Sequence, residues 1–176
     1  MKIFGIKIEK GYGAYERGVK EDVFLKYPDG EYYTGQVWPG WTHFPDFTSE
    51  KGREWWKDEI KFFATTGVDG FWNDMNEPAV FEDGTFPHDV RHDYDGHPCS
   101  HRKAHNIYGM QMIRATQEGL RRFGKGRRTF SITRSTLAIS LISSPASLSV
   151  SRLAVPLPMA IRLTPCLSHR RASVCS

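Results

Sequence analysis

The order of the predicted elements indicates an α/β protein with a parallel sheet. Between residues 48 and 133, two helical segments alternate with two short strands, and this alternation is typical of parallel sheets. The first of these strands, residues 68–73, is apolar and is followed at once by Asp74 and Glu77. A buried strand has this pattern when its carboxyl end opens into an active site.

The segment before residue 48 predicts a strand, a hairpin and two loops. Ile6 and Ile8, with Ile3 before them, alternate with charged residues as in a half-buried strand, and a turn at residues 11–13 ends it. The apolar segments 23–25 and 32–33 flank Pro28-Asp29-Gly30, a turn sequence, and predict a hairpin. Residues 37–40 and 44–47 are rich in aromatic residues and proline, so we expect loops there.

The first helix is expected between residues 49 and 66. Thr48 or Ser49 can cap its start, and Gly67 can end it. Its apolar residues recur at spacings of four and three, which places them on one face: Trp56, Ile60 and Phe63.

A second helix is expected from about Lys103 to Phe123, after a long polar loop at residues 82–101. Gly124 ends this helix, and residues 129–133 form another short strand. One stripe of small and apolar residues runs along the helix: Ala104, Tyr108, Met112, Ala115, Gly119 and Phe123.

The average composition hides two different segments. Residues 1–135 hold 20 Lys and Arg against 20 Asp and Glu, and they contain all the glycines and aromatic residues. Residues 136–176 lack glycine, aromatic and acidic residues, and Ser, Leu, Arg and Pro fill 24 of these 41 positions. The formal charge of +4 therefore comes from four arginines of this tail. Because residues 1–135 carry no basic excess, we expect no binding to nucleic acid.

We therefore take residues 1–135 as the folded part and residues 136–176 as an aberrant tail. Ser, Leu and Arg have the largest codon sets, so their joint excess suggests an out-of-frame or mis-spliced reading after about Ser135. The alternative is a genuine disordered tail, in which Ser and Pro are common, although Leu and Ile are frequent for a solvated segment. An in-frame tail in a close relative would contradict the frameshift.

The cysteines and the apolar segments bear on the cellular compartment. Cys99, Cys166 and Cys175 give no even disulfide framework, so we expect a reducing compartment and a cytoplasmic protein. Residues 1–10 alternate apolar and charged residues, unlike a signal peptide. No apolar run is long enough to span a bilayer, so we expect a soluble protein without a membrane partner.

The residue types near the strand end favour carbohydrate chemistry. Asp74 and Glu77 suit an enzyme that uses carboxylates on a neutral substrate, and Trp38, Trp41 and Trp72 suit packing against a sugar ring, whose C–H faces are apolar. The structural alternative is that the carboxylates cap or brace a loop and the tryptophans belong to the core. The spacing alone leaves both interpretations open.

The segment Trp72-Asn73-Asp74-Met75-Asn76-Glu77-Pro78 resembles the signature of glycoside hydrolase family 31, the α-glucosidase family. The resemblance extends over residues 5–136, because further blocks follow the family in order. These blocks are Gly11-Tyr12-Gly13, Val37-Trp38-Pro39-Gly40, Phe44-Pro45-Asp46-Phe47-Thr48, His105-Asn106, Tyr108-Gly109 and Thr133-Arg134-Ser135-Thr136.

The resemblance implies a partial (β/α)₈ barrel, since 176 residues are fewer than the roughly 250 of a complete one. It implies hydrolysis of terminal α-linked glucose from oligosaccharides, with retention and without a cofactor or metal. Asp74 is implied as the nucleophile that forms the glycosyl-enzyme intermediate. Glu77 is implied to brace the strand end, and the role of Asp46 stays open. The residues implied to contact the α-glucoside are Trp38, Trp72, Met75 and Arg134.

The chain departs from the family pattern after Arg134. A retaining glycosidase needs a second carboxyl group roughly 5–5.5 Å from the nucleophile, and the family supplies it as an aspartate in a Trp-x-Gly-Asp stretch. Residues 137–142 read Leu-Ala-Ile-Ser-Leu-Ile instead. We therefore expect poor folding and little or no activity for the chain alone.

A cluster of six histidines or cysteines in and beside the loop at 82–101 allows two interpretations. The cluster contains His88, His92, His97, Cys99, His101 and His105. The first interpretation is a solvated active-site loop, which the resemblance supports. The second interpretation is a zinc site. The spacing matches no standard structural zinc pattern, so we favour the loop.

Three other interpretations stay open. Within the family, the specificity can be that of an α-xylosidase, an α-glucan lyase or a transferase. Outside catalysis, the chain can be a carbohydrate-binding remnant that keeps Trp38, Trp72 and Arg134 but lacks the acid. It can also be the product of a pseudogene or a faulty gene model. The oligomeric state is left open by the sequence.

Overall fold

The computed structural model describes residues 5–133 and 135, all within the unit Met1–Ile142. Residues 136–176, the tail on which the reading-frame hypothesis depends, lie outside the described residues. None of the described helices is long and apolar enough to cross a membrane. The helices are α1 (Gly13–Lys20), α2 (Glu50–Thr65) and α3 (His101–Phe123). The strands are β1 (Ile6–Lys7), β2 (Gly35–Val37), β3 (Gly40–His43), β4 (Gly70–Asn73), β5 (Arg91–His92), β6 (Cys99–Ser100) and β7 (Phe130–Thr133).

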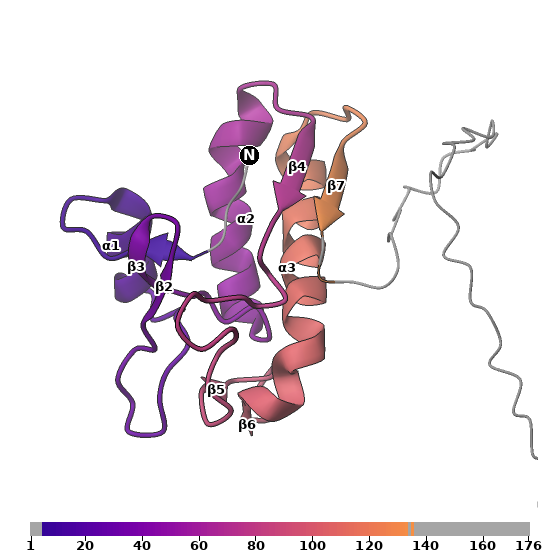
Figure 1. Cartoon of the computed structure of the whole chain (residues 1–176). Coiled ribbons are helices and arrows are strands. Elements are labelled where there is room, and N and C mark those ends of the chain that lie inside the picture. The colour runs from indigo at the N-terminus through magenta and orange to yellow at the C-terminus, as the bar shows by residue number, and fades with distance from the viewer. Residues whose placement is uncertain (1–4, 134, 136–176) are drawn as a thin grey trace, which may run out of the picture. The chain divides into compact units, whose positions relative to one another are not determined.

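A β–α–β unit made of β4, α3 and β7 positions the candidate site. The two strands pair in parallel, from Gly70 opposite Phe130 to Asn73 opposite Thr133. Helix α3 comes between them in the sequence and runs in the opposite direction (Figure 1). This confirms the predicted α/β order with a parallel sheet. Two parallel strands do not close a barrel, so the described residues form an open piece of one.

The predicted helices begin and end close to the expected residues. The Ser49 hydroxyl caps α2 by accepting the Gly52 amide at 3.0 Å, and Gly67 leaves the helix at a φ of +102°, which glycine adopts without strain. Helix α3 starts at His101, two residues before the predicted start, and ends before Gly124 as expected.

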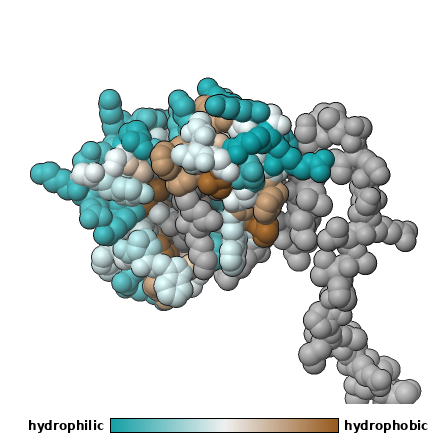
Figure 2. Space-filling view, turned by 90° about the horizontal axis from the view of Figure 1, so that it is seen from above, coloured by the Kyte–Doolittle hydropathy of each residue, from teal (hydrophilic) through white to brown (hydrophobic). Residues whose placement is uncertain are grey.

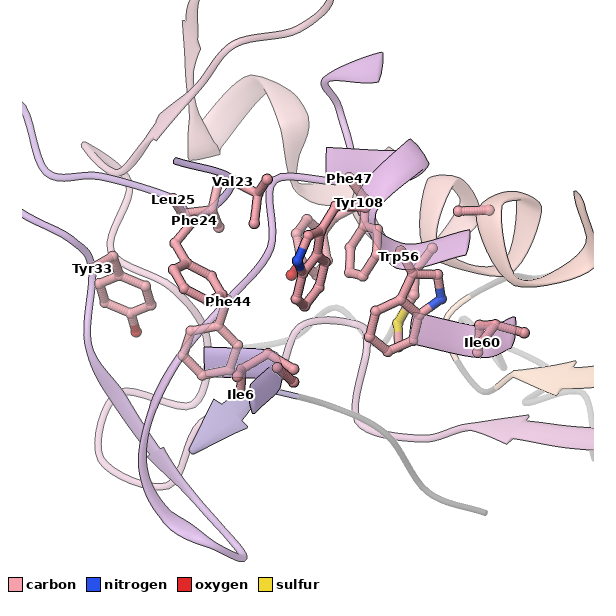
Figure 3. Packing of buried hydrophobic residues seen from close by; sticks show 14 of the residues in the cluster. Ile6, Val23, Phe24, Leu25, Tyr33, Phe44, Phe47, Trp56, Ile60 and Tyr108 are labelled. Carbon is pink, nitrogen blue, oxygen red and sulfur yellow. The ribbon is translucent and has the colours of Figure 1, made fainter. Parts of the chain in front are cut away.

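The core joins α2, α3 and the aromatic segment before α2. The Phe47 ring packs edge-on against Trp56 of α2 at 5.2 Å and against Tyr108 of α3 at 5.3 Å between centroids (Figure 3). The Tyr108 hydroxyl donates to the Pro45 carbonyl at 3.0 Å, so the buried ring leaves its polar end satisfied. Each of these side chains stabilises the fold by about 2–3 kcal/mol through burial. On the face seen in Figure 2, hydrophobic side chains emerge in small areas between hydrophilic ones.

Several elements differ from the sequence-based expectation, and among them the short paired strands β5 and β6 lie inside the expected loop at 82–101. Helix α1 was not predicted from the sequence. The buried residues of α1 are only Ala14 and Gly18, which are too small to form an apolar stripe. Gly18 is small because a Cβ there would lie 2.3 Å from Cζ of Phe24. The expected loop at 37–40 is instead the turn of a β2–β3 hairpin, with Val37 opposite Gly40.

Two other N-terminal expectations, the hairpin and the first strand, are confirmed. The predicted hairpin around Pro28 holds by reciprocal backbone bonds, such as the one from the Tyr33 amide to the Leu25 carbonyl at 2.8 Å. The predicted first strand appears as β1, which pairs with β3. Ile3 lies outside the described residues.

Candidate active site

Asp74 follows directly on the last residue of β4 and is 6% exposed. Its Oδ1 accepts the Met75 amide at 3.1 Å. Met75 has a φ of +60°, so the backbone turns sharply immediately after the carboxylate. The strand therefore ends by changing direction at the residue predicted to be the nucleophile.

Side chains of β4 alternate between a covered and an open face. Phe71 packs edge-on against Phe63 of α2 at 6.0 Å, and the Asn73 amide nitrogen donates to Thr116 Oγ1 of α3 at 3.2 Å. Since successive side chains of a strand point to opposite faces, Trp72 belongs to the other face. It is 42% exposed there.

Asn76 joins the segment after Asp74 to the two neighbouring elements. It is fully buried, its Oδ1 accepts the Thr133 hydroxyl of β7 at 2.8 Å, and its Nδ2 donates to the Gly109 carbonyl of α3 at 3.4 Å. These bonds hold the carboxyl ends of β4 and β7 together. Sequence reasoning included Asn76 in the motif but gave it no role.

Trp38 comes close to the segment that follows Asp74. It lies at the tip of the β2–β3 hairpin, is 76% exposed, and its ring meets that of Phe81 edge-on at 5.3 Å. The hairpin is fastened there by the Phe81 amide, which donates to the Gln36 carbonyl at 3.0 Å. Trp41 on β3 is also exposed, so both hairpin tryptophans are surface residues and the core alternative is wrong for them.

The remaining predicted contacts are placed differently. The side chain of Met75 packs against the hydrophobic core. Arg134 lies outside the described residues, and so does the segment 137–142 that replaces the expected acid. Glu77 is half-buried three residues beyond Asp74.

A second buried carboxylate, Asp46, lies shortly before the start of α2. Its Oδ1 accepts the Thr48 amide at 2.9 Å and the Thr48 hydroxyl at 2.6 Å, and its Oδ2 accepts the Asp93 amide at 2.7 Å. His92 Nδ1 lies 3.5 Å from Oδ1. Burial acts to raise the pKa of Asp46, but the His92 contact and the hydrogen bonds outweigh it and lower this pKa.

His92 begins a row of histidines that the sequence did not predict. His92 and His101 are 1% and 0% exposed, so these two are buried and the expectation of a solvated loop is wrong for them. His88 and His97 of the same loop are exposed. Within residues 5–133 and 135, no three His, Cys, Asp or Glu side chains are arranged to hold a metal ion. Cys99 is a buried free thiol.

Over residues 2–140 the chain matches the model of the glycosyl hydrolases family 31 TIM-barrel domain. It belongs to this family. The family 31 chain is 46% identical over 131 residues to alpha-glucosidase 2 of Bacillus thermoamyloliquefaciens, a match that covers 74% of the chain and 17% of that relative.

Solved structures agree with the fold. The glucosidase II alpha subunit bound to Glc1Man2 is similar with a TM-score of 0.66 and 33% identity, covering 76% of this chain and 15% of that one. The family 31 alpha-glucosidase from Bacteroides thetaiotaomicron is similar with a TM-score of 0.59 and 37% identity, covering 76% of this chain and 21% of that one. The family resemblance and the partial-barrel fold are thereby confirmed, and the chain spans about a fifth or less of these relatives.

Proposed function

We propose that Asp74 is the catalytic nucleophile of a retaining α-glucosidase that removes terminal α-linked glucose from oligosaccharides. The observation that carries the proposal is the position of Asp74 at the carboxyl end of β4, a parallel strand in a family 31 barrel piece. Active sites of such barrels lie at the carboxyl ends of their strands. The alpha-glucosidase relatives support the reaction class.

The chemistry assigns two stages to this carboxylate. An Asp74 oxygen attacks the anomeric carbon while the glycosidic C–O bond breaks, and a general acid gives its proton to the leaving oxygen. The resulting glycosyl ester is then cleaved by water, which passes its proton to the same group acting as base. The anomeric configuration is inverted twice, so it is retained.

Two tryptophans suit the sugar contacts. Trp72 is exposed on the open face of β4, next to Asp74 in sequence, and Trp38 is exposed beside Phe81 on the segment after Asp74. Aromatic rings of this kind pack against the apolar C–H faces of a pyranose. We propose that both contact the glucoside.

The general acid is the part of the machinery that residues 137–142 do not supply by their type. We propose that the 176-residue chain alone turns over natural α-glucosides negligibly. It would still react with a substrate whose leaving group departs without protonation. This difference allows the nucleophile to be tested separately from turnover.

The experiment is covalent labelling of the 176-residue chain with a mechanism-based 5-fluoro-α-glucosyl fluoride, followed by peptide mapping. We expect a glycosyl ester on Asp74, and none in Asp74→Asn. Asp69→Asn is the matched control, because Asp69 is exposed just before the other end of β4. A chain with native circular dichroism that retains oligosaccharides but stays unlabelled would overturn the proposal in favour of a carbohydrate-binding remnant.

A further inference from the structure

Three imidazole rings lie in series between Asp46 and the protein surface. His92 Nε2 is 2.9 Å from His101 Nδ1, and His101 Nε2 is 3.0 Å from His105 Nδ1. His105 Nδ1 is also 3.4 Å from the Thr85 hydroxyl. The row crosses three parts of the chain, since His92 is on β5, His101 and His105 are on α3, and Asp46 precedes α2.

The carboxylate sets the direction of these hydrogen bonds. A neutral imidazole has one N–H donor and one bare nitrogen acceptor, and an ionised Asp46 can only accept. His92 Nδ1 lies 3.5 Å from Asp46 Oδ1 without making a hydrogen bond, but the adjacent negative charge favours a proton on Nδ1 over a bare lone pair. Nε2 of His92 is then left to accept from His101 Nδ1–H. By the same rule His101 Nε2 accepts from His105 Nδ1–H, so all three rings carry the proton on Nδ1.

The three histidines help to fasten the loop at residues 82–100 to the core. Beside them, the Asp93 amide donates to Asp46 and the Tyr94 amide donates to Thr48 Oγ1 at 3.0 Å. The Arg53 Nη2 group donates to both carboxylate oxygens of Asp95, at 2.9 and 3.0 Å, and also holds this loop. This loop is therefore held both by an ion pair and by the imidazole row.

We infer that His92, His101 and His105 form a hydrogen-bonded relay, polarised by the neighbouring Asp46 carboxylate, that clamps residues 82–100 onto the core, and that uptake of a proton by the relay releases this segment. The inference goes beyond the proposed function and does not rest on it. A proton taken up at the buried His101 creates a cation that burial disfavours.

The surroundings of His101 agree with this inference. Burial, together with the neighbouring His92, His105 and His88, lowers the pKa of His101 to about 3. Asp46 lies close enough to His92 to favour a cation, but its oxygens already accept from Thr48 and Asp93. The titratable and charged groups around the relay are His88, Asp46, Cys99, Lys103 and Tyr108.

The test is NMR on the 176-residue chain. Histidine ring ¹⁵N spectra at pH 7.5 are expected to show the Nδ1–H tautomer for His92 and His101, with His101 neutral down to pH 5. Amide exchange, corrected for its intrinsic pH dependence, should show protection of Asp93 and Tyr94 falling about thirtyfold between pH 7.5 and 5, since an opened histidine regains its ordinary pKa. Amides of the β4–β7 ladder should change much less.

Two variants separate the relay from general acid sensitivity. His101→Gln should remove most of the pH dependence of Asp93 and Tyr94 exchange. His97→Gln, at an exposed position of the same loop, should leave that dependence unchanged. The inference is overturned if the imidazoles titrate together near pH 6.5, as in an unfolded chain, if His101 carries its proton on Nε2, or if Asp93 exchange follows the ladder amides.

Discussion

The surroundings of Asp46 and Asp74 differ although the two carboxylates are almost equally buried, at 7% and 6% exposure. Asp46 accepts from two backbone amides and a hydroxyl and lies next to a histidine, within a packed aromatic core. Asp74 accepts the amide of the next residue at a strand end, beside a face on which Trp72 is exposed. Burial by itself therefore does not distinguish a carboxylate that holds the fold from one that is presented to a substrate.

The largest expected effect separates the two carboxylates by stability. In Asp46→Asn, an amide NH₂ must face backbone or hydroxyl donors, so we expect a loss of about 3 kcal/mol in the free energy of unfolding. If Asp74 is placed for catalysis, as we propose, Asp74→Asn should change it by about 1 kcal/mol or less, because active sites often give up stability for function. Urea unfolding followed by tryptophan fluorescence measures both. Equal losses in the two variants would remove the distinction.

A smaller effect is expected from pH. Burial lowers the pKa of His43, and burial with neighbouring histidines lowers the pKa of His101 to about 3. The unfolded chain, with an ordinary histidine pKa of about 6.5, therefore binds these protons more readily than the folded chain. The free energy of unfolding should be highest above about pH 6.5 and fall by on the order of 2 kcal/mol toward pH 5.

The lowered pKa of Asp46 acts in the same direction at lower pH, where its stabilising contribution is lost as the carboxylate becomes protonated. Urea unfolding at several pH values between 5 and 7.5 checks the prediction. His101→Gln should flatten the curve, whereas His97→Gln should leave it unchanged. A free energy of unfolding that rises toward pH 5 would contradict it.

The smallest expected effect on stability is at Trp72. Because its side chain is 42% exposed on the open face of β4, Trp72→Ala should cost about 0.5 kcal/mol or less. Trp56→Ala, in the core at 1% exposure, should cost about 3–5 kcal/mol. If Trp72 contacts the sugar, its variant should nonetheless label more slowly on Asp74. Unchanged labelling would limit Trp72 to a structural role.

The elements that the sequence predicted well carry their signals locally. Ser49 and Gly67 mark the ends of α2, and the spacing of Trp56 and Ile60 marks its buried face. Strand β4 was predictable with its polar end because apolar residues stop abruptly at Asp74. Helix α1 was not, since Gly18 is there to admit the Phe24 ring, and that reason is visible only after folding.

In the candidate site too, local sequence signals predict single residues but not the contacts between distant segments. Asp74 and Trp72 could be predicted from the strand end and the family signature, whereas the link between Asp46 and Asp93 joins residues 47 positions apart. No local pattern distinguishes the buried His92 from the exposed His88 or His97. The contact of Trp38 with Phe81 likewise depends on how the β2–β3 hairpin docks.

Gly109 shows how the placement of Asp74 restricts sequence change at a distance. A Cβ at this position of α3 would lie 2.5 Å from the Asn76 carbonyl oxygen, on the segment that follows Asp74. Even an alanine there would push that backbone or tilt the helix. Codon 109 is therefore closed to every amino acid but one, and a substitution on this inner face of α3 would act as a mutation of the candidate active site.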